Sequence, residues 1–139
     1  MKQFSLTREL MGASITAQVL CLPEGLQAGV YGGTLPHIGA VSVADPQGNI
    51  TTQQFPAHKD GMVSERWAKT LSEAGYVPAV VMSGIHYDHL SRNEISAVVE
   101  LTDAMLSEIL HFSCQLGIGR DDDDPGGGFC HDARLLSII

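Results

Sequence analysis

The spacing of hydrophobic residues changes once along this chain, and that change constrains the fold more than any other feature. Up to residue 55, apolar and polar residues alternate in part, in segments bounded by turn-forming residues, a pattern typical of strands. From about residue 60, apolar residues recur every three or four positions, as in helices with one buried face. A chain that begins with hairpins and ends with helices predicts an α/β domain of the α+β type.

The predicted strands are short and separated by turn residues. The most apolar of them, residues 77–82, is a continuous run typical of a buried strand, with Pro78 near its start. The other predicted strands are residues 4–10, 14–22, 26–31, 38–44 and 50–55. Because hairpin turns connect most of them, we expect a mostly antiparallel sheet of five to six strands.

Two helices are predicted, each with an identifiable start. Residues 63–74 place Trp67 and Leu71 on one helical face, and Asp60 stands where it can cap the helix. The segment Ser91-Arg92-Asn93-Glu94 forms a capping box, from which an apolar stripe continues to Phe112. We expect both helices on one face of the sheet, in a single domain over residues 1–113.

Composition and charge narrow the possible partners. The 139 residues suffice for one domain, and a formal net charge of −8 disfavours nucleic acid and anionic membranes as partners. No apolar run approaches the ~20 residues of a membrane span, and the N-terminus lacks a signal-peptide core, so we expect a cytoplasmic protein.

The three cysteines are not at ligand spacing, which disfavours a cysteine-based zinc site. Residues 114–139, acidic and rich in glycine, are predicted to be a disordered tail.

The first of three polar segments that carry candidate chemistry is residues 32–39, between two predicted strands. Gly32 and Gly33 allow a close backbone approach and positive φ angles, and Pro36 stiffens the loop before His37. The alternative interpretation is an ordinary strand connection with an exposed histidine.

The second polar segment, residues 55–61, leads into the first predicted helix. A helix N-terminus offers unpaired N–H donors and a positive dipole end, which suit an anion. Lys59 stands beside this end, and Arg66 lies one to two turns further along. Alternatively, Asp60 is simply a cap and Lys59 is solvated, although that interpretation does not account for His58.

The third polar segment, residues 83–89, follows the predicted buried strand. In α/β sheets, ligands commonly bind beyond the carboxyl ends of the central strands. His86, Tyr87 and Asp88 stand just after the predicted buried strand, at such a position. If the three segments share one sheet edge, His37 and His86 could bind a metal together with His58, with Asp60 or Asp88 as a hard ligand. The histidines could instead be donors to an anionic ligand. A polar loop with solvated side chains is the alternative interpretation.

The three segments together resemble a known family. The segments GGTLPHIG, HKDG before a helix, and GIHYD are similar to the small accessory proteins of gallate-type decarboxylases, described as LpdD-like prenylated-flavin chaperones. The resemblance covers residues 3–112. It implies a fold similar to proteasome-assembly chaperones, a homodimer, and an accessory role beside a UbiD-type aromatic-acid decarboxylase that uses prenylated FMN.

The resemblance also implies a flavin site. The glycines and the helix start would offer N–H groups to the phosphate, two basic side chains would supply charge, and the histidines would contact the ligand or a bridging metal. The implied contact residues are Gly32, Gly33, His37, His58, Lys59, Asp60, Gly61, Arg66, His86, Tyr87 and Asp88.

Two other functions fit the same residues. One is an independent metal-dependent hydrolase or lyase with a His/Asp site, and the other is a chaperone that works through its surface with purely structural histidines. The sequence has no Gly-x-Ser-x-Gly elbow, phosphate loop or Gly-x-Gly-x-x-Gly, and no evident nucleophile with its base. Binding is therefore favoured over catalysis.

Overall fold

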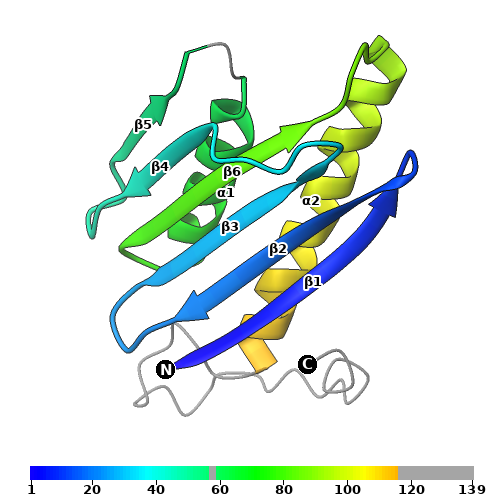
Figure 1. The fold of residues 1–139 in the computed structure, drawn as a ribbon. Helices are drawn as coiled ribbons and strands as arrows, with labels where there is room; N and C mark the ends of the chain where they lie inside the picture. Colours follow the sequence, from blue (N-terminus) through cyan, green and yellow to red (C-terminus); the bar gives the residue numbers. More distant parts are fainter. Residues whose placement is uncertain (57–58, 116–139) are drawn as a thin grey trace.

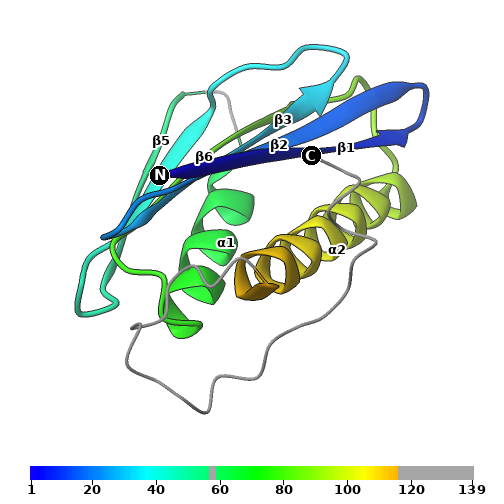
Figure 2. The same ribbon diagram turned by 90° about the horizontal axis from the view of Figure 1, so that it is seen from below.

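A twisted sheet with both helices on one side forms the body of the protein (Figures 1 and 2). The computed structural model describes residues 1–56 and 59–115. In chain order, its elements are β1 (Lys2–Leu10), β2 (Ala13–Cys21), β3 (Leu26–Gly33), β4 (Ala40–Ala44), β5 (Ile50–Gln54), α1 (Gly61–Glu73), β6 (Ala79–His86) and α2 (Arg92–Gln115). The predicted order of strands and helices is confirmed.

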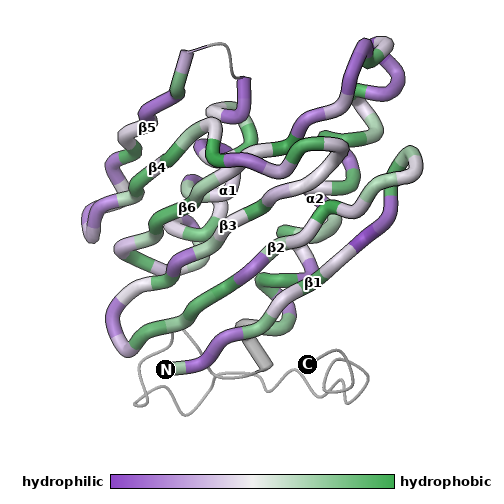
Figure 3. Tube along the Cα trace, viewed as in Figure 1, coloured by the Kyte–Doolittle hydropathy of each residue, from purple (hydrophilic) through white to green (hydrophobic). Residues whose placement is uncertain are grey.

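The sheet has six strands in the order β1-β2-β3-β6-β4-β5. Neighbouring strands are antiparallel except β3 and β6, which are parallel, so the mostly antiparallel sheet is confirmed. β6 lies between β3 and β4. Its inward side chains are buried, whereas Val80 and Met82 are partly exposed, so the strand predicted to be buried is fully buried on one face only. Figure 3 shows hydrophobic residues concentrated in the central strands, whereas edge strand β5 is largely hydrophilic.

The core lies between the sheet and the two helices. Trp67 and Leu71 of α1 are fully buried there, as are Met105 and Ile109 of α2. Each such side chain contributes roughly 1.5–3 kcal/mol relative to an exposed one. Burial also raises the pKa of the Cys21 thiol to about 11, which keeps it protonated and unreactive at neutral pH.

The capping box at the start of α2 is confirmed. The Ser91 backbone N–H donates to Glu94 Oε1 at 3.0 Å, and the Glu94 N–H donates to Ser91 Oγ at 3.2 Å. These bonds hold the pKa of Glu94 below its usual value. Neither helix of the described chain is long and apolar enough to cross a membrane.

The ends of several elements differ from the sequence-based boundaries. β3 continues to Gly33 and β6 to His86, because the two strands pair in parallel over their whole length, with Gly33 opposite His86. β4 begins only at Ala40, and α2 continues to Gln115. The longer ladder brings the polar ends of β3 and β6 to the same edge of the sheet. The predicted tail falls mostly on residues 116–139, which lie outside the described residues.

Candidate functional site

The β3–β4 loop lies directly against the end of β6. The Thr34 N–H donates to the His86 carbonyl at 2.7 Å, and the Gly39 N–H donates to the Ser83 carbonyl at 2.9 Å. A Cβ atom at Gly84 would collide with the His37 carbonyl, so a glycine is needed for this approach. The loop therefore holds His37 beside the strand end.

The predicted glycine pair serves the chain itself. A Cβ at Gly32 would collide with the Ser14 carbonyl and Ile15 of β2, and one at Gly33, whose φ is 78°, would collide with the His86 carbonyl. Both glycines belong to β3 and neither lines the cavity described below. The close backbone approach was predicted correctly, but its partners are neighbouring strands.

His37 and Asp60 form a partly buried pair at this edge. His37 Nε2 lies 2.9 Å from Asp60 Oδ2, and His37 Nδ1 lies 2.9 Å from the Leu35 carbonyl oxygen. The exposed fractions of the two side chains are only 16% and 9%. Both ring nitrogens of His37 therefore have an oxygen of this chain within hydrogen-bond distance, which fixes the orientation of the imidazole.

Asp60 joins three elements and is more than a helix cap. It occupies the N-cap position of α1, as predicted, but its side chain makes no capping hydrogen bond. The Gly61 N–H instead donates to Gln54 Oε1 at 3.0 Å. Asp60 Oδ1 accepts the Ile85 N–H at 2.9 Å, and its carbonyl accepts the Ser83 hydroxyl at 2.6 Å. The start of α1 is thereby fixed to β6 and to the His37 loop.

A buried network of hydroxyl groups supports the same helix start. Ser42 Oγ lies 2.8 Å from both Ser64 Oγ and Thr52 Oγ1, which joins β4, α1 and β5. Sequence reasoning missed these residues. The available signal was the serine at an inward position of the apolar strand β4.

These elements enclose a cavity of about 450 Å³, a size typical of small-molecule sites. Five residues predicted from the sequence line it: His37, Lys59, Asp60, His86 and Tyr87. The other wall is apolar and consists of Met62, Val63, Ile85, Leu90, Ile95, Val98 and Val99. The cavity thus has a polar, partly cationic side and a hydrophobic side.

Tyr87 contributes a hydroxyl group near this cavity. Its hydroxyl donates to the Leu10 carbonyl at 2.8 Å, which connects the β6–α2 loop to the end of β1. Burial, and to a smaller extent the negative charge of Glu9, raises the pKa of Tyr87 above its usual value. The phenol is therefore neutral at neutral pH and acts as a hydrogen-bond donor.

The remaining predicted contacts lie elsewhere. Arg66 pairs with Asp103 of α2 at 2.8 Å and does not line the cavity. Asp88 pairs with His86 at 2.9 Å on the exposed surface and also stays outside the lining.

The predicted metal site depends on a residue that lies outside the described part of the chain, His58. Within residues 1–56 and 59–115, no group of three or more His, Cys, Asp or Glu side chains is arranged to hold a metal ion.

Comparison with known proteins adds the family. The prenylated flavin chaperone LpdD-like domain matches residues 9–113, a range that contains every residue lining the cavity. The chain belongs to the LpdD-like prenylated flavin chaperone family. Protein LpdD of Lactiplantibacillus plantarum is 30% identical over 109 residues, which span 75% of this chain and 80% of that protein. The resemblance predicted from the three polar segments is therefore confirmed.

A solved structure is also similar to this LpdD-like chain. It is the crystal structure of a chaperone complex for yeast 20S proteasome assembly, matched at 13% sequence identity with a TM-score of 0.48. The match covers 78% of this chain and 96% of the other.

Proposed function

We propose that this chain binds prenylated FMN in the cavity beside His37 and passes it to a UbiD-type aromatic-acid decarboxylase. The observation that carries the proposal is the gathering of His37, Lys59 and Tyr87, from three separate segments, on one cavity with an apolar opposite wall. Membership of the prenylated flavin chaperone family supports the same ligand. The role is that of an accessory protein in the cytoplasm.

The two sides of the cavity suit the two ends of this ligand. The dimethylbenzene edge and the prenyl-derived ring of a prenylated flavin are apolar, and they match the wall that includes Ile85, Val98 and Val99. The phosphate needs positive charge. Lys59, which lines the polar side of the cavity, supplies a positive charge there.

Anaerobic titration of the purified chain with reduced prenylated FMN, followed by flavin absorbance and fluorescence, tests this proposal. Lys59→Ala should weaken binding about tenfold, the loss of one charge-assisted hydrogen bond. Arg66→Ala is the matched control, because its side chain is paired with Asp103 away from the cavity, and it should leave affinity unchanged. Absence of flavin binding by the wild-type chain would refute the proposal, as would equal effects of the two variants.

Two further parts of the proposal have separate tests. A metal held by His37, His58 and His86 would be detected by metal analysis of protein purified without chelators. The chain is also proposed to act as a homodimer, which the molecular mass of the flavin-free protein tests.

A further inference from the structure

The apolar stripe of α2 is buried only toward the C-terminal end of the helix. Met105 is fully buried, whereas Val98 and Val99, about two turns earlier, are partly exposed and Ile95 is 50% exposed. Met62, at the start of α1, is 73% exposed on the same cavity. Within the described part of the chain nothing covers these side chains fully, so the apolar wall of the cavity faces water until a ligand binds.

A strongly apolar segment of the chain lies outside the described residues. Residues 135–139, which we call the LLSII segment, carry four aliphatic side chains in five positions. Leucine and isoleucine are among the residues most often fully buried, because removing their side chains from water is favourable. The match to the family domain ends at residue 113, so the family assigns this segment no role. The segment is therefore a candidate to cover an apolar surface.

The LLSII segment is attached closely enough to reach the apolar wall. Its first residue follows the last residue of α2, Gln115, by 20 positions, and an extended chain of that length spans roughly 66 Å. Ile95 precedes Gln115 by 20 positions in the same helix, so the wall lies about 30 Å from the end of α2. The connection is therefore about twice as long as the distance that it must cross.

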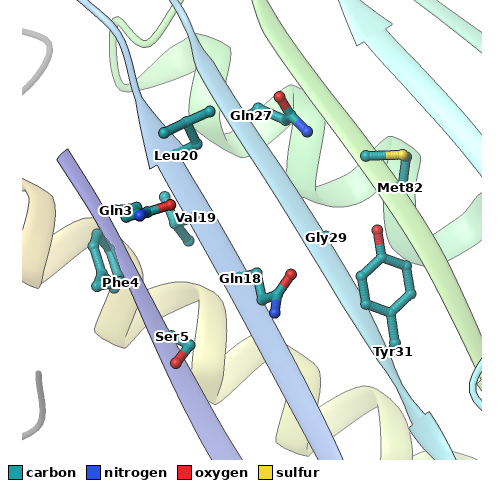
Figure 4. Close-up of a pocket in the computed structure, with 10 residues that line it drawn as sticks. All are labelled: Gln3, Phe4, Ser5, Gln18, Val19, Leu20, Gln27, Gly29, Tyr31 and Met82. Atoms are coloured by element: carbon teal, nitrogen blue, oxygen red, sulfur yellow. The ribbon is translucent and has the colours of Figure 1, made fainter. Parts of the chain in front are cut away.

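The other surface that could receive the segment is more polar. Figure 1 looks onto the open face of the sheet, the side opposite the helices, and Figure 4 shows the hollow of about 480 Å³ in it. Amide and hydroxyl groups, among them those of Gln18, Gln27 and Tyr31, line part of this hollow. Aliphatic side chains would cover these groups without offering them hydrogen bonds, at a cost in free energy. The apolar wall on the helix side carries no such penalty.

We infer that, before flavin binds, the LLSII segment packs against the apolar wall of the cavity in its own chain. Leucine and isoleucine side chains then lie against Ile95, Val98 and Met62, and both sets are removed from water. Because the segment is tethered, its effective concentration at the wall is on the order of 1 mM, so a contact of modest affinity suffices.

This packing also regulates the cavity. The flavin proposed above and the LLSII segment need the same wall, formed by residues such as Ile85, Val98 and Val99, so each displaces the other. The segment therefore raises the flavin concentration that is needed for binding, and loading with flavin releases the segment. This consequence rests on the proposed function, whereas the packing of the segment does not.

Paramagnetic broadening of methyl NMR signals in the flavin-free, full-length chain tests the packing. A nitroxide is attached to Cys130, five residues before the segment, in a Cys114→Ser background. Cys21 stays unlabelled, because it is buried and its pKa is raised to about 11. The nitroxide should broaden the methyl signals of Ile95 and Val98, since it lies within roughly 17 Å of the start of the segment.

Two tail variants make the test specific. Leu136→Asp places a carboxylate against aliphatic side chains and should weaken the packing about tenfold or more, which removes the broadening. Ala133→Asp is the matched control, because it adds the same charge two residues before the segment and should leave the broadening unchanged. Broadening that is lost in Leu136→Asp and kept in Ala133→Asp supports the inference.

Three results would overturn the inference. The first is no broadening at Ile95 and Val98 in the wild type, and the second is broadening that persists in Leu136→Asp. The third is broadening in a mixture of isotope-labelled chains without nitroxide and nitroxide-labelled chains without isotope, since the segment would then come from a second copy.

A flavin titration tests the regulation separately. Leu136→Asp should bind reduced prenylated FMN several-fold more tightly than Ala133→Asp, and equal affinities would overturn the displacement. Because the NMR measurement needs no flavin, its failure is distinct from failure of the proposed function.

Discussion

The cavity on the helix side of the sheet and the open face on the other side differ in the contacts that hold them. The first depends on backbone contacts and charged groups, and the second on uncharged side chains. Around the cavity, Gly84 lies against the His37 backbone, and a partly buried ion pair fixes the loop to α1. On the open face, the atoms nearest to a Cβ at Gly29 belong to the Tyr31 side chain, and the surroundings are uncharged. The first region is held in one arrangement, as a small-ligand site requires. In the second, the side chains that lie against the glycine can change rotamer.

Substitution of one glycine in each region should give the largest difference between them. Gly84→Ala sets a Cβ against the His37 carbonyl, so the β3–β4 loop must leave β6, and the free energy of unfolding should fall by about 4 kcal/mol. Gly29→Ala meets the far end of the Tyr31 side chain, which can rotate, and should cost under about 1 kcal/mol. Urea denaturation followed by Trp67 fluorescence measures both.

Equal losses of stability in the two glycine variants would mean that the loop is not held by its contact with β6. A flavin titration sharpens the comparison further. Gly84→Ala should abolish detectable binding even under conditions where it remains folded, whereas Gly29→Ala should bind as the wild type does.

The two His–Asp pairs at the loop end offer the next largest contrast. Asp60→Ala leaves the Ile85 N–H without its acceptor and removes the contact with His37 Nε2, and should lower the free energy of unfolding by about 3 kcal/mol. Asp88→Ala breaks a pair whose side chains are 45% and 71% exposed, and should cost under about 1 kcal/mol. Equilibrium urea unfolding at neutral pH compares them.

Asp60→Asn separates the two roles of this side chain. Its amide oxygen can still accept the Ile85 N–H, so its loss of stability should lie between those of the wild type and Asp60→Ala. If Asp60→Ala is no more destabilising than Asp88→Ala, the partly buried pair does not fix the start of α1 to the β3–β4 loop.

Much of the fold could be predicted because hydrophobic periodicity reports which face of each element is buried. The strand ends could not be predicted in the same way. His86 is polar and follows an apolar run, so it resembles a loop residue, but its place in β6 comes from parallel pairing with Gly33, far away in sequence. Local pattern contains no information about that partner.

In the candidate site too, some contacts could be predicted from the local sequence and others depend on how distant elements pack. His37, Lys59 and Tyr87 meet as predicted, because polar residues at the ends of neighbouring segments reach one edge of the sheet. Arg66 does not join them, because Asp103 of α2 lies close enough to pair with it, and the position of α2 is a matter of packing. The Ser42–Ser64 contact likewise depends on how α1 rests on β4.

The smallest expected contrast concerns two tyrosine hydroxyls. Tyr87→Phe removes the hydrogen bond to the Leu10 carbonyl that joins the cavity to the end of β1, and should lower the free energy of unfolding by about 1 kcal/mol at neutral pH. Tyr31→Phe on the open face removes a hydroxyl that bonds to nothing in the described part of the chain, and should change the stability of the protomer little.

The pH dependence of Tyr87→Phe makes the test specific. Because the pKa of folded Tyr87 lies above 10.0, the unfolded chain loses its phenol proton first as the pH rises, and this tyrosine's contribution to stability declines above pH 10. Urea unfolding of the wild type and Tyr87→Phe should therefore show a constant difference below about pH 9 that narrows above about pH 10. A difference that widens there would mean that the phenolate, not the phenol, is favoured in the folded chain, and that the Tyr87 hydroxyl does not donate to Leu10.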